Sequence, residues 1–268
     1  MSQSEPQFIE VTGADGSGRR IAYLLDRPAT TSGPGVVWLS GYTSDMVGQK
    51  ADTLASWSER HARPYTRFDY CGNGRSEGRF EDATIGDWIE DTFQVFTRLT
   101  DGPQILVGSS MGGWIALALV RRLQREDPAG AARIRGLVLI APAVDMTEKL
   151  MWQAFPPDVR AAIEREGVWF HPASNGDDPY PITFRLIEEG RRHLFGNEPF
   201  DPGCPVEILH GQRDADVPWQ QSLAQLDLLA RDDVRLTLVK DGEHRLSRRE
   251  DLALIVRAVA GIDGPPSE

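Results

Sequence analysis

Lysine, cysteine and long apolar segments are all scarce in this chain of 268 residues. Only Lys50, Lys149 and Lys240 are lysines among 29 basic residues, and 40 acidic residues bring the net charge to −11. Proteins that bind nucleic acid need clustered basic residues to displace phosphate counterions, so this balance argues against a nucleic-acid partner. It also gives no electrostatic attraction to an anionic membrane surface.

The first residues of the chain lack the basic flank and apolar run of a secretory signal. The longest uncharged stretch, residues 102–120, holds a Gly-Ser-Ser-Met-Gly-Gly segment in its middle, so we do not interpret it as a membrane span. Cys71 and Cys204 lie far apart, and no Cys or His pair has the spacing of zinc ligands. We expect reduced, structural cysteines and no metal site.

Segments typical of strands and helices alternate along most of the chain. Apolar runs predict strands at 8–12, 21–25, 35–39, 65–70, 104–107, 136–140, 206–209 and 235–239. Helical periodicity predicts helices at 50–61, 84–99, 112–124, 220–230 and 248–260. This order predicts a mostly parallel, twisted sheet with helices on both faces. A glycine-rich turn between the first two strands adds an antiparallel hairpin at one edge.

The alternation stops between about residues 145 and 202, where the sequence is helical, irregular and rich in Trp, Phe and Pro. An insertion at this point covers the carboxyl edge of the sheet, where open α/β sheets bind their ligands. We therefore predict a single domain over 7–262, with a core (7–144 and 203–262) and a helical cap (145–202).

Aromatic residues are concentrated in the cap. They either form an acyl-chain pocket or pack the cap onto the sheet, and the sequence favours neither interpretation. The candidates for substrate contacts are Trp152, Phe155 and Trp169.

The strongest chemical signal is the run Gly108-Ser109-Ser110-Met111-Gly112. It matches the G-x-S-x-G pattern, and it lies between a predicted buried strand and a predicted helix, which is the setting that this pattern requires. A turn of this kind exposes the serine hydroxyl at the edge of the sheet, and the glycines let strand and helix approach each other. Ser110 is therefore the candidate nucleophile.

A serine nucleophile needs a base and an acid, which follow it along the chain in this type of fold. The loop after the strand at 206–209 offers Asp214 and Asp216; we favour Asp214 and expect Asp216 to cap the following turn. Among five histidines, only His244 lies between the last strand and the last helix. His210, at a strand end, is expected to hydrogen-bond loop backbone instead.

Acyl transfer also needs two N–H donors directed at the oxyanion of the tetrahedral intermediate. The residue after the nucleophile, Met111, supplies one by the rule for this turn. We choose the backbone N–H of Tyr42 as the second, because Gly41 lets the loop after the strand at 35–39 approach closely. The glycine loop at 69–76 lacks the last glycine of a dinucleotide-binding pattern, and no cofactor is expected.

Several of these motifs occur together in one known family. The segment Asp69–Ser76, the Ser110 turn, the run from His210 to Pro218 and the late His244 resemble the α/β-hydrolase superfamily. Other runs, among them Asp101–Ser110, are similar to a branch of mitochondrial palmitoyl-protein thioesterases that also cleave an acyl-glucuronide. No mitochondrial presequence is visible, so we expect the bacterial cytoplasm as the location.

This resemblance implies an α/β-hydrolase fold with Ser110, Asp214 and His244 as nucleophile, acid and base. The implied substrate is a small-molecule ester or thioester, or an acylated cysteine. A general carboxylesterase is the main alternative. Three alternatives fit the motifs less well: a cofactor-free haloperoxidase-like enzyme, a C–C bond hydrolase and a non-catalytic binding protein of the same fold. Haloalkane dehalogenases and epoxide hydrolases are disfavoured, because they need an aspartate where this chain has Ser110.

Overall fold

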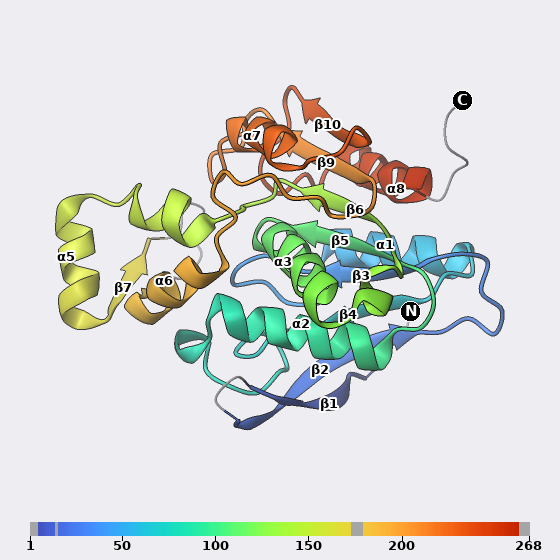
Figure 1. Ribbon diagram of the computed structural model, residues 1–268, viewed down its shortest axis with the longest axis horizontal. Helices are drawn as coiled ribbons and strands as arrows, with labels where there is room; N and C mark the ends of the chain where they lie inside the picture. Colours follow the sequence, from blue (N-terminus) through green and yellow to red (C-terminus); the bar gives the residue numbers. More distant parts are fainter. Residues whose placement is uncertain (1–4, 14–15, 173–178, 263–268) are drawn as a thin grey trace.

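An eight-stranded sheet forms the centre of the molecule (Figure 1). The structure is a computed structural model that describes residues 5–13, 16–172 and 179–262. In spatial order the strands are β1 (Gln7–Thr12), β2 (Gly18–Asp26), β4 (Tyr65–Phe68), β3 (Gly35–Leu39), β5 (Gln104–Ser109), β6 (Ile134–Ile140), β9 (Val206–Gly211) and β10 (Val234–Val239). β1, β2 and β4 pair antiparallel, and all pairs from β4 to β10 are parallel. The predicted parallel sheet with an antiparallel hairpin at one edge is confirmed.

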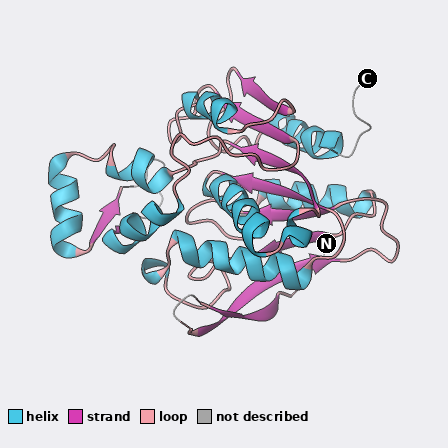
Figure 2. Cartoon of the chain, in the orientation of Figure 1, coloured by secondary structure: helices cyan, strands magenta, loops and turns pink. Residues whose placement is uncertain are grey.

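Helices cover both faces of the sheet, as Figures 1 and 2 show. The strand β3 explains why both faces are apolar, since Val36 and Trp38 pack on one side and Val37 and Leu39 on the other. The first side is covered by α1 (Gln49–Arg60) and α8 (Arg249–Ile262), and the second by α2 (Ile85–Leu99), α3 (Met111–Glu126) and α7 (Gln220–Leu228). These five helices begin and end within two residues of the predicted positions, and a short α4 (Pro128–Ala131) follows α3.

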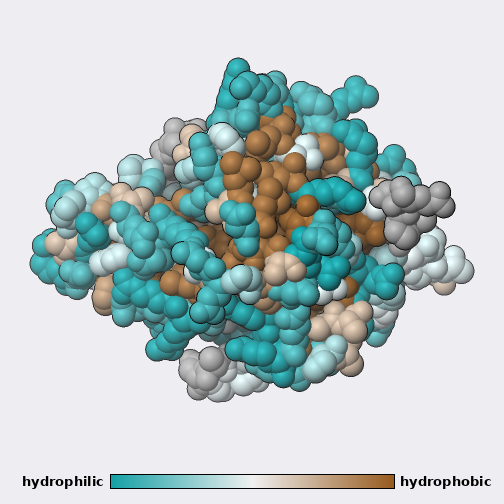
Figure 3. Space-filling model, turned by 45° about the horizontal axis from the view of Figure 1, so that its top comes forward, coloured by the Kyte–Doolittle hydropathy of each residue, from teal (hydrophilic) through white to brown (hydrophobic). Residues whose placement is uncertain are grey.

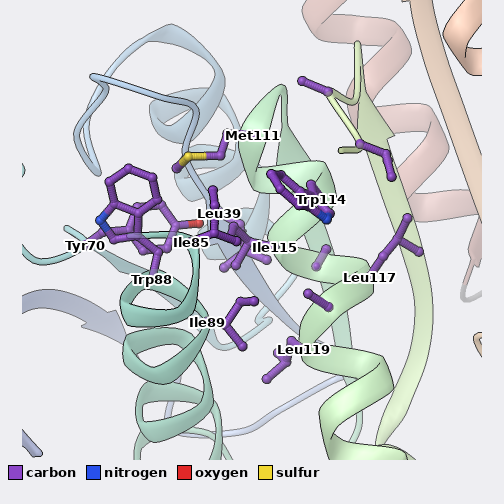
Figure 4. Close-up of a cluster of buried hydrophobic side chains, with 14 of the residues drawn as sticks. Leu39, Tyr70, Ile85, Trp88, Ile89, Met111, Trp114, Ile115, Leu117 and Leu119 are labelled. Carbon is purple, nitrogen blue, oxygen red and sulfur yellow. The ribbon is translucent and has the colours of Figure 1, made fainter. Parts of the chain in front are cut away.

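The helix α2 shows how local sequence and packing agree. Thr84 and Asp87 form a reciprocal capping box at its N-terminus, which satisfies amide groups that the helix leaves free. Its buried side chains recur with helical spacing and pack against α3, and Figure 4 shows Ile89 of α2 facing Ile115 and Leu119 of α3. Trp88 and Trp114 are fully buried in the same cluster, where such large side chains contribute most to the hydrophobic stabilisation.

The segment between β6 and β9 forms the cap and lies to one side of the sheet (Figure 1). It contains a π-helical turn (Thr147–Trp152), α5 (Pro157–Glu166), β7 (Val168–His171), β8 (Tyr180–Thr183), α6 (Phe184–Gly190) and a 3₁₀ turn (Arg191–His193). The cap contains the helical and irregular segments that the sequence predicted, and it also contains an antiparallel hairpin of β7 and β8, which the sequence reasoning did not predict. Four-residue strands, one of them containing Pro181, carry little local signal and depend on the surfaces against which they pack.

Polar residues cover most of the face that Figure 3 shows, and apolar residues gather near its middle. In the described part of the chain, no helix combines the length and the apolar character that crossing a bilayer requires. Cys71 and Cys204 are both buried and unpaired.

The two ends of the cap are joined by Asp145, a buried residue with a left-handed backbone (φ 59°). Its carboxylate accepts hydrogen bonds from the N–H of Phe195 (2.8 Å) and Gly196 (3.0 Å), and it forms an ion pair with Lys149 Nζ (3.0 Å). Asp145→Ala leaves the buried N–H of Phe195 and the partly buried N–H of Gly196 without this partner, and we expect it to lower the free energy of unfolding by about 2–3 kcal/mol. Urea denaturation measures this loss. Asp158→Ala, on the exposed side of α5, is the matched control and should cost less than about 0.5 kcal/mol.

Candidate active site

Ser110 lies in the turn between β5 and α3 and has a left-handed backbone conformation, with φ 54° and ψ −118°. A side chain at Gly112 would place its Cβ 2.1 Å from the carbonyl oxygen of Leu39, so only glycine fits the close contact between this turn and β3. A non-glycine residue at positive φ costs about 1–3 kcal/mol. The surrounding strand and helix therefore hold Ser110 in a strained conformation at the carboxyl end of the sheet.

The three residues predicted as nucleophile, base and acid lie in one hydrogen-bonded series. His244 Nε2 is 3.1 Å from Ser110 Oγ, and His244 Nδ1 is 2.7 Å from Asp214 Oδ2. Ser110 follows β5, Asp214 follows β9 and His244 follows β10. Because these strands are parallel, their carboxyl ends meet at the same edge of the sheet and bring together residues that are 134 positions apart.

The protonation of Asp214 determines the direction of these hydrogen bonds. Its side chain is fully buried. Burial alone would raise its pKa, but hydrogen bonds from His210, from His244 and from the backbone N–H of Val217 hold the pKa well below the ordinary value. An ionised carboxylate can only accept hydrogen bonds, so Nδ1 of His244 carries a proton, and in the neutral form of the ring Nε2 faces Ser110 with its lone pair. This histidine can therefore take the proton of the Ser110 hydroxyl.

The loop after β9 differs from expectation in two respects. We expected Asp216 to cap the turn, but Oδ1 of Asp214 accepts from the N–H groups of both Asp216 (2.9 Å) and Val217 (2.8 Å). His210 does hydrogen-bond loop backbone, at the carbonyl of Val217 (3.0 Å), but its Nε2 also lies 2.9 Å from Asp214 Oδ2. The Asp214 carboxylate thus accepts hydrogen bonds from two backbone N–H groups of the turn and from two histidine rings, because it is the acceptor nearest to the end of β9.

The role of His210 was missed by sequence reasoning. Its side chain is fully buried, its Nε2 serves Asp214 and its Nδ1 is 2.7 Å from Ser222 Oγ in α7. Since the Nε2–H group faces two acceptor oxygens, Nδ1 of the neutral ring accepts a hydrogen bond from the Ser222 hydroxyl. His210 therefore connects the carboxylate to α7. The spacing of four residues between His210 and Asp214 was a signal, but it did not show where the ring points.

The two predicted oxyanion donors flank Ser110. Met111 is the first residue of α3, where helical N–H groups have no partner within the helix and the macrodipole favours negative charge. Tyr42 follows Gly41, at which a Cβ would lie 3.4 Å from the Cβ of Ser110. Both backbones are thus close to the serine, and their function as donors stays a prediction.

A pocket of about 980 Å³ opens beside Ser110 and His244. Among the predicted substrate contacts, Phe155 lines this pocket, but Trp152 and Trp169 are not among its lining residues. Trp152 packs against Phe184 and lies under the guanidinium of Arg191, and Trp169 packs edge-on against Phe155 with their ring centres 5.1 Å apart. Composition located the apolar residues in the cap but could not show which of them face inward.

The pocket combines apolar and polar surfaces. Residues at the end of β6 and in the cap give an apolar part, made of Ala143, Met146, Leu150, Met151, Phe155 and Ile182. The loops after β3 and β10 and the first residues of α1 give a polar part, which includes Ser44, Gln49, Lys50, Arg245 and Ser247. Such a pocket suits a ligand with an apolar chain and a polar end.

Lys50 is a pocket residue that the sequence reasoning did not select. Its Nζ donates to the carbonyl oxygen of Arg245 (2.5 Å), the residue directly after His244. Burial and the nearby Arg245 lower the pKa of Lys50 to about 8. Lys50 therefore helps to hold the loop that carries His244. The one signal for Lys50 in the sequence was the rarity of lysine, since the chain has three lysines and many arginines.

Asp214, Asp216 and His244 are the described residues whose ligand atoms come within 4.8 Å of one another. The oxygens of Asp214, however, already accept from two backbone N–H groups and two histidines. A cation could bind only by displacing these donors, so the arrangement serves proton transfer better than metal binding.

The sheet order and the Ser110 turn agree with the comparisons with known proteins. The chain belongs to the α/β-hydrolase family, and it is an enzyme of the hydrolase class. A family model described as serine aminopeptidase, S33, matches residues 36–185.

Named relatives narrow this assignment. The mitochondrial palmitoyl-protein thioesterase ABHD10 of Bos taurus is 35% identical over 84% of this chain and 72% of its own. The structure of mouse α/β-hydrolase domain-containing protein 10 matches with a TM-score of 0.83 and 30% identity, over 97% of this chain and 98% of the mouse chain. A crystal structure from Agrobacterium vitis S4 matches with a TM-score of 0.90 and 39% identity, over 97% and 99% of the two chains. The resemblance predicted from the motifs is confirmed.

Proposed function

We propose that this protein is a serine hydrolase that cleaves acyl thioesters or carboxylic esters through a Ser110–His244–Asp214 triad. The observation that carries the proposal is the continuous series of hydrogen bonds from Ser110 Oγ through the His244 ring to the buried Asp214 carboxylate. A hydroxyl is a weak nucleophile at neutral pH, and this arrangement supplies the base that it needs.

In the first half of the reaction His244 Nε2 takes the proton of Ser110 as Oγ attacks the carbonyl carbon. The N–H groups of Met111 and Tyr42 stabilise the oxyanion, and Asp214 stabilises the imidazolium. The intermediate then collapses: the bond to the leaving group breaks, His244 protonates the departing thiol or alcohol, and an acyl-serine ester remains.

In the second half a water molecule attacks the acyl-serine. His244 takes one proton from the water and returns it to Ser110 Oγ when the ester bond breaks, which releases the carboxylic acid. The acyl carbon gains the OH of this water and Ser110 Oγ gains its remaining proton, so the substrate and one water balance both halves.

The apolar part of the pocket supports a substrate with an acyl chain, and the related proteins named palmitoyl-protein thioesterase support a long one. A general carboxylesterase would use the same steps on short or aryl esters. We place the reaction in the bacterial cytoplasm, which is consistent with two unpaired cysteines and with the match to a bacterial structure.

The test is hydrolysis of matched acyl thioesters and oxygen esters, from acetyl to palmitoyl, with Ser110→Ala as the control. Preference for long-chain thioesters supports the acyl-protein thioesterase, and acylated cysteine peptides then become the next substrates. Preference for short or aryl oxygen esters reassigns the protein as a carboxylesterase. The proposal is wrong if none of these substrates is turned over in a Ser110-dependent way.

The position of Phe155 gives a further prediction. Phe155→Ala removes apolar surface from the pocket, and we expect kcat/KM to fall about 10-fold for palmitoyl substrates and less than about 3-fold for acetyl substrates. Steady-state kinetics on the two substrates measures the difference. Trp152→Ala is the matched control, because Trp152 lies outside the pocket lining and should affect both chain lengths alike. An equal loss for both substrates in Phe155→Ala would assign Phe155 to packing.

A further inference from the structure

The side chain of Tyr42 joins the loop after β3 to the cap. Its hydroxyl donates to the carbonyl oxygen of Pro181 in β8 (2.8 Å), across 139 positions of sequence. Its ring packs edge-on against Tyr180 of the same strand (5.6 Å between ring centres), and against Phe80 (5.0 Å) and Trp88 (5.8 Å) of the core domain. Tyr42 is thus one of the points at which the cap hairpin contacts the sheet domain.

The loop that carries Tyr42 also contacts the nucleophile turn. Gly41 packs directly against the Ser110 turn, and the N–H of Ser44 donates to the carbonyl of Gly41 (3.2 Å) in a tight turn. Thr43, at φ 55°, is strained. A strained turn is stabilised by a hydrogen bond to a neighbouring element, and the hydroxyl of Tyr42 makes such a bond to β8.

The hairpin that receives this hydrogen bond is part of the pocket wall. Tyr180 and Ile182 of β8 line the pocket. His171 of β7 stacks on Tyr180 with ring centres 5.0 Å apart and planes 7° from parallel, and Trp169 packs on Phe155. The cap aromatics therefore form a continuous set of contacts that ends at Tyr42.

We propose that Tyr42 is a positioning residue, whose hydroxyl ties the oxyanion loop to the cap hairpin, so that the cap affects the chemical step even for substrates too short to reach it. The inference rests on the proposed function, in which the N–H of Tyr42 stabilises the oxyanion. It assigns to the side chain a role that a backbone donor by itself does not require.

The test is the kinetics of Tyr42→Phe on an acetyl ester, which occupies the region of Ser110 and not the cap. Losing one neutral hydrogen bond should lower kcat about 3–10-fold with little change in KM, since alignment of the oxyanion and not ground-state binding is affected. Tyr23→Phe is the matched control, because its hydroxyl bonds Gln7 at the edge strand β1, and its kcat should equal that of the wild type. An unchanged kcat in Tyr42→Phe overturns the proposal.

A change on the hairpin side separates coupling from simple destabilisation. Trp169→Ala, outside the pocket lining, should also lower kcat for the acetyl ester, but it should add little in the Tyr42→Phe background because the tie is already lost. Fully additive losses would mean that the two residues act independently, and the proposal would then be wrong.

Amide hydrogen exchange tests the tie even if the protein turns over no ester. Tyr42→Phe should raise exchange both at residues 41–44 and at residues 180–183, and Tyr23→Phe at neither. If exchange rises at both segments but the wild type turns over no ester, the Tyr42 hydrogen bond does connect the loop to the hairpin, and the proposed function is wrong. Unchanged exchange at either segment would reject the tie, whatever the activity.

Discussion

Ser110→Ala is expected to lower kcat by roughly 10⁴–10⁶-fold without loss of the fold. In the proposed mechanism this substitution removes the atom that forms the acyl-serine bond, and the remaining catalysis would come from the proposed oxyanion donors and from substrate binding. Alanine fits the turn sterically, because the close contacts there involve Gly108 and Gly112. Steady-state or single-turnover kinetics on the preferred ester measures the loss, and thermal unfolding checks the fold.

Two further variants make this prediction specific. Ser56→Ala, in α1 and outside the pocket, is the control and should keep wild-type kcat. His244→Ala should lose about as much as Ser110→Ala, and the double variant should be little worse than either, because nucleophile and base act as a unit. Labelling by a fluorophosphonate should disappear with Ser110→Ala. Turnover by Ser110→Ala within 10-fold of the wild type would contradict the triad.

The arrangement of Ser110, Asp214 and His244 was predictable because each residue directly follows a strand, and the position of a strand end can be recognised from the local sequence. Ser110 lies between two glycines after a buried strand, and Asp214 and His244 follow two later strands. In a parallel sheet, the carboxyl ends of strands meet at one edge whatever the exact register. Approximate strand positions were therefore sufficient to bring these three residues together.

Other parts of the site depend on side-chain direction, which the sequence pattern does not contain. Trp169 and Phe155 are both apolar cap residues, yet only Phe155 lines the pocket. The hairpin β7–β8 is stabilised by distant aromatic residues such as Tyr42, so its short strands have no clear local pattern. The contact between His210 and Asp214 depends on the direction of the His210 ring, which the sequence does not give. The sequence therefore predicted only a hydrogen bond from His210 to loop backbone.

Asp214→Asn is expected to lower kcat by about 10⁴-fold, through the tautomer of His244. The ionised Asp214 accepts from His244 Nδ1 and His210 Nε2 through one oxygen. An asparagine amide that turns its NH₂ group toward these rings makes a ring nitrogen accept, which moves the proton of His244 to Nε2 and removes the lone pair that faces Ser110. Asp216→Asn is the matched control and should change kcat less than about 3-fold. A larger loss in Asp216→Asn than in Asp214→Asn would reverse the assignment of the acid.

The same substitution has a pH-dependent effect on stability. The native pKa of Asp214 lies below its ordinary value of about 3.9, so its ionised form stabilises the fold fully above that value and loses this contribution as the pH falls toward the native pKa. We expect Asp214→Asn to be less stable than the wild type by about 2–3 kcal/mol at pH 7, with a smaller difference at pH 3. Urea denaturation at both pH values measures this. A difference that stays constant or grows on acidification would show that Asp214 is not held ionised, and the inferred protonation of His244 would then lose its basis.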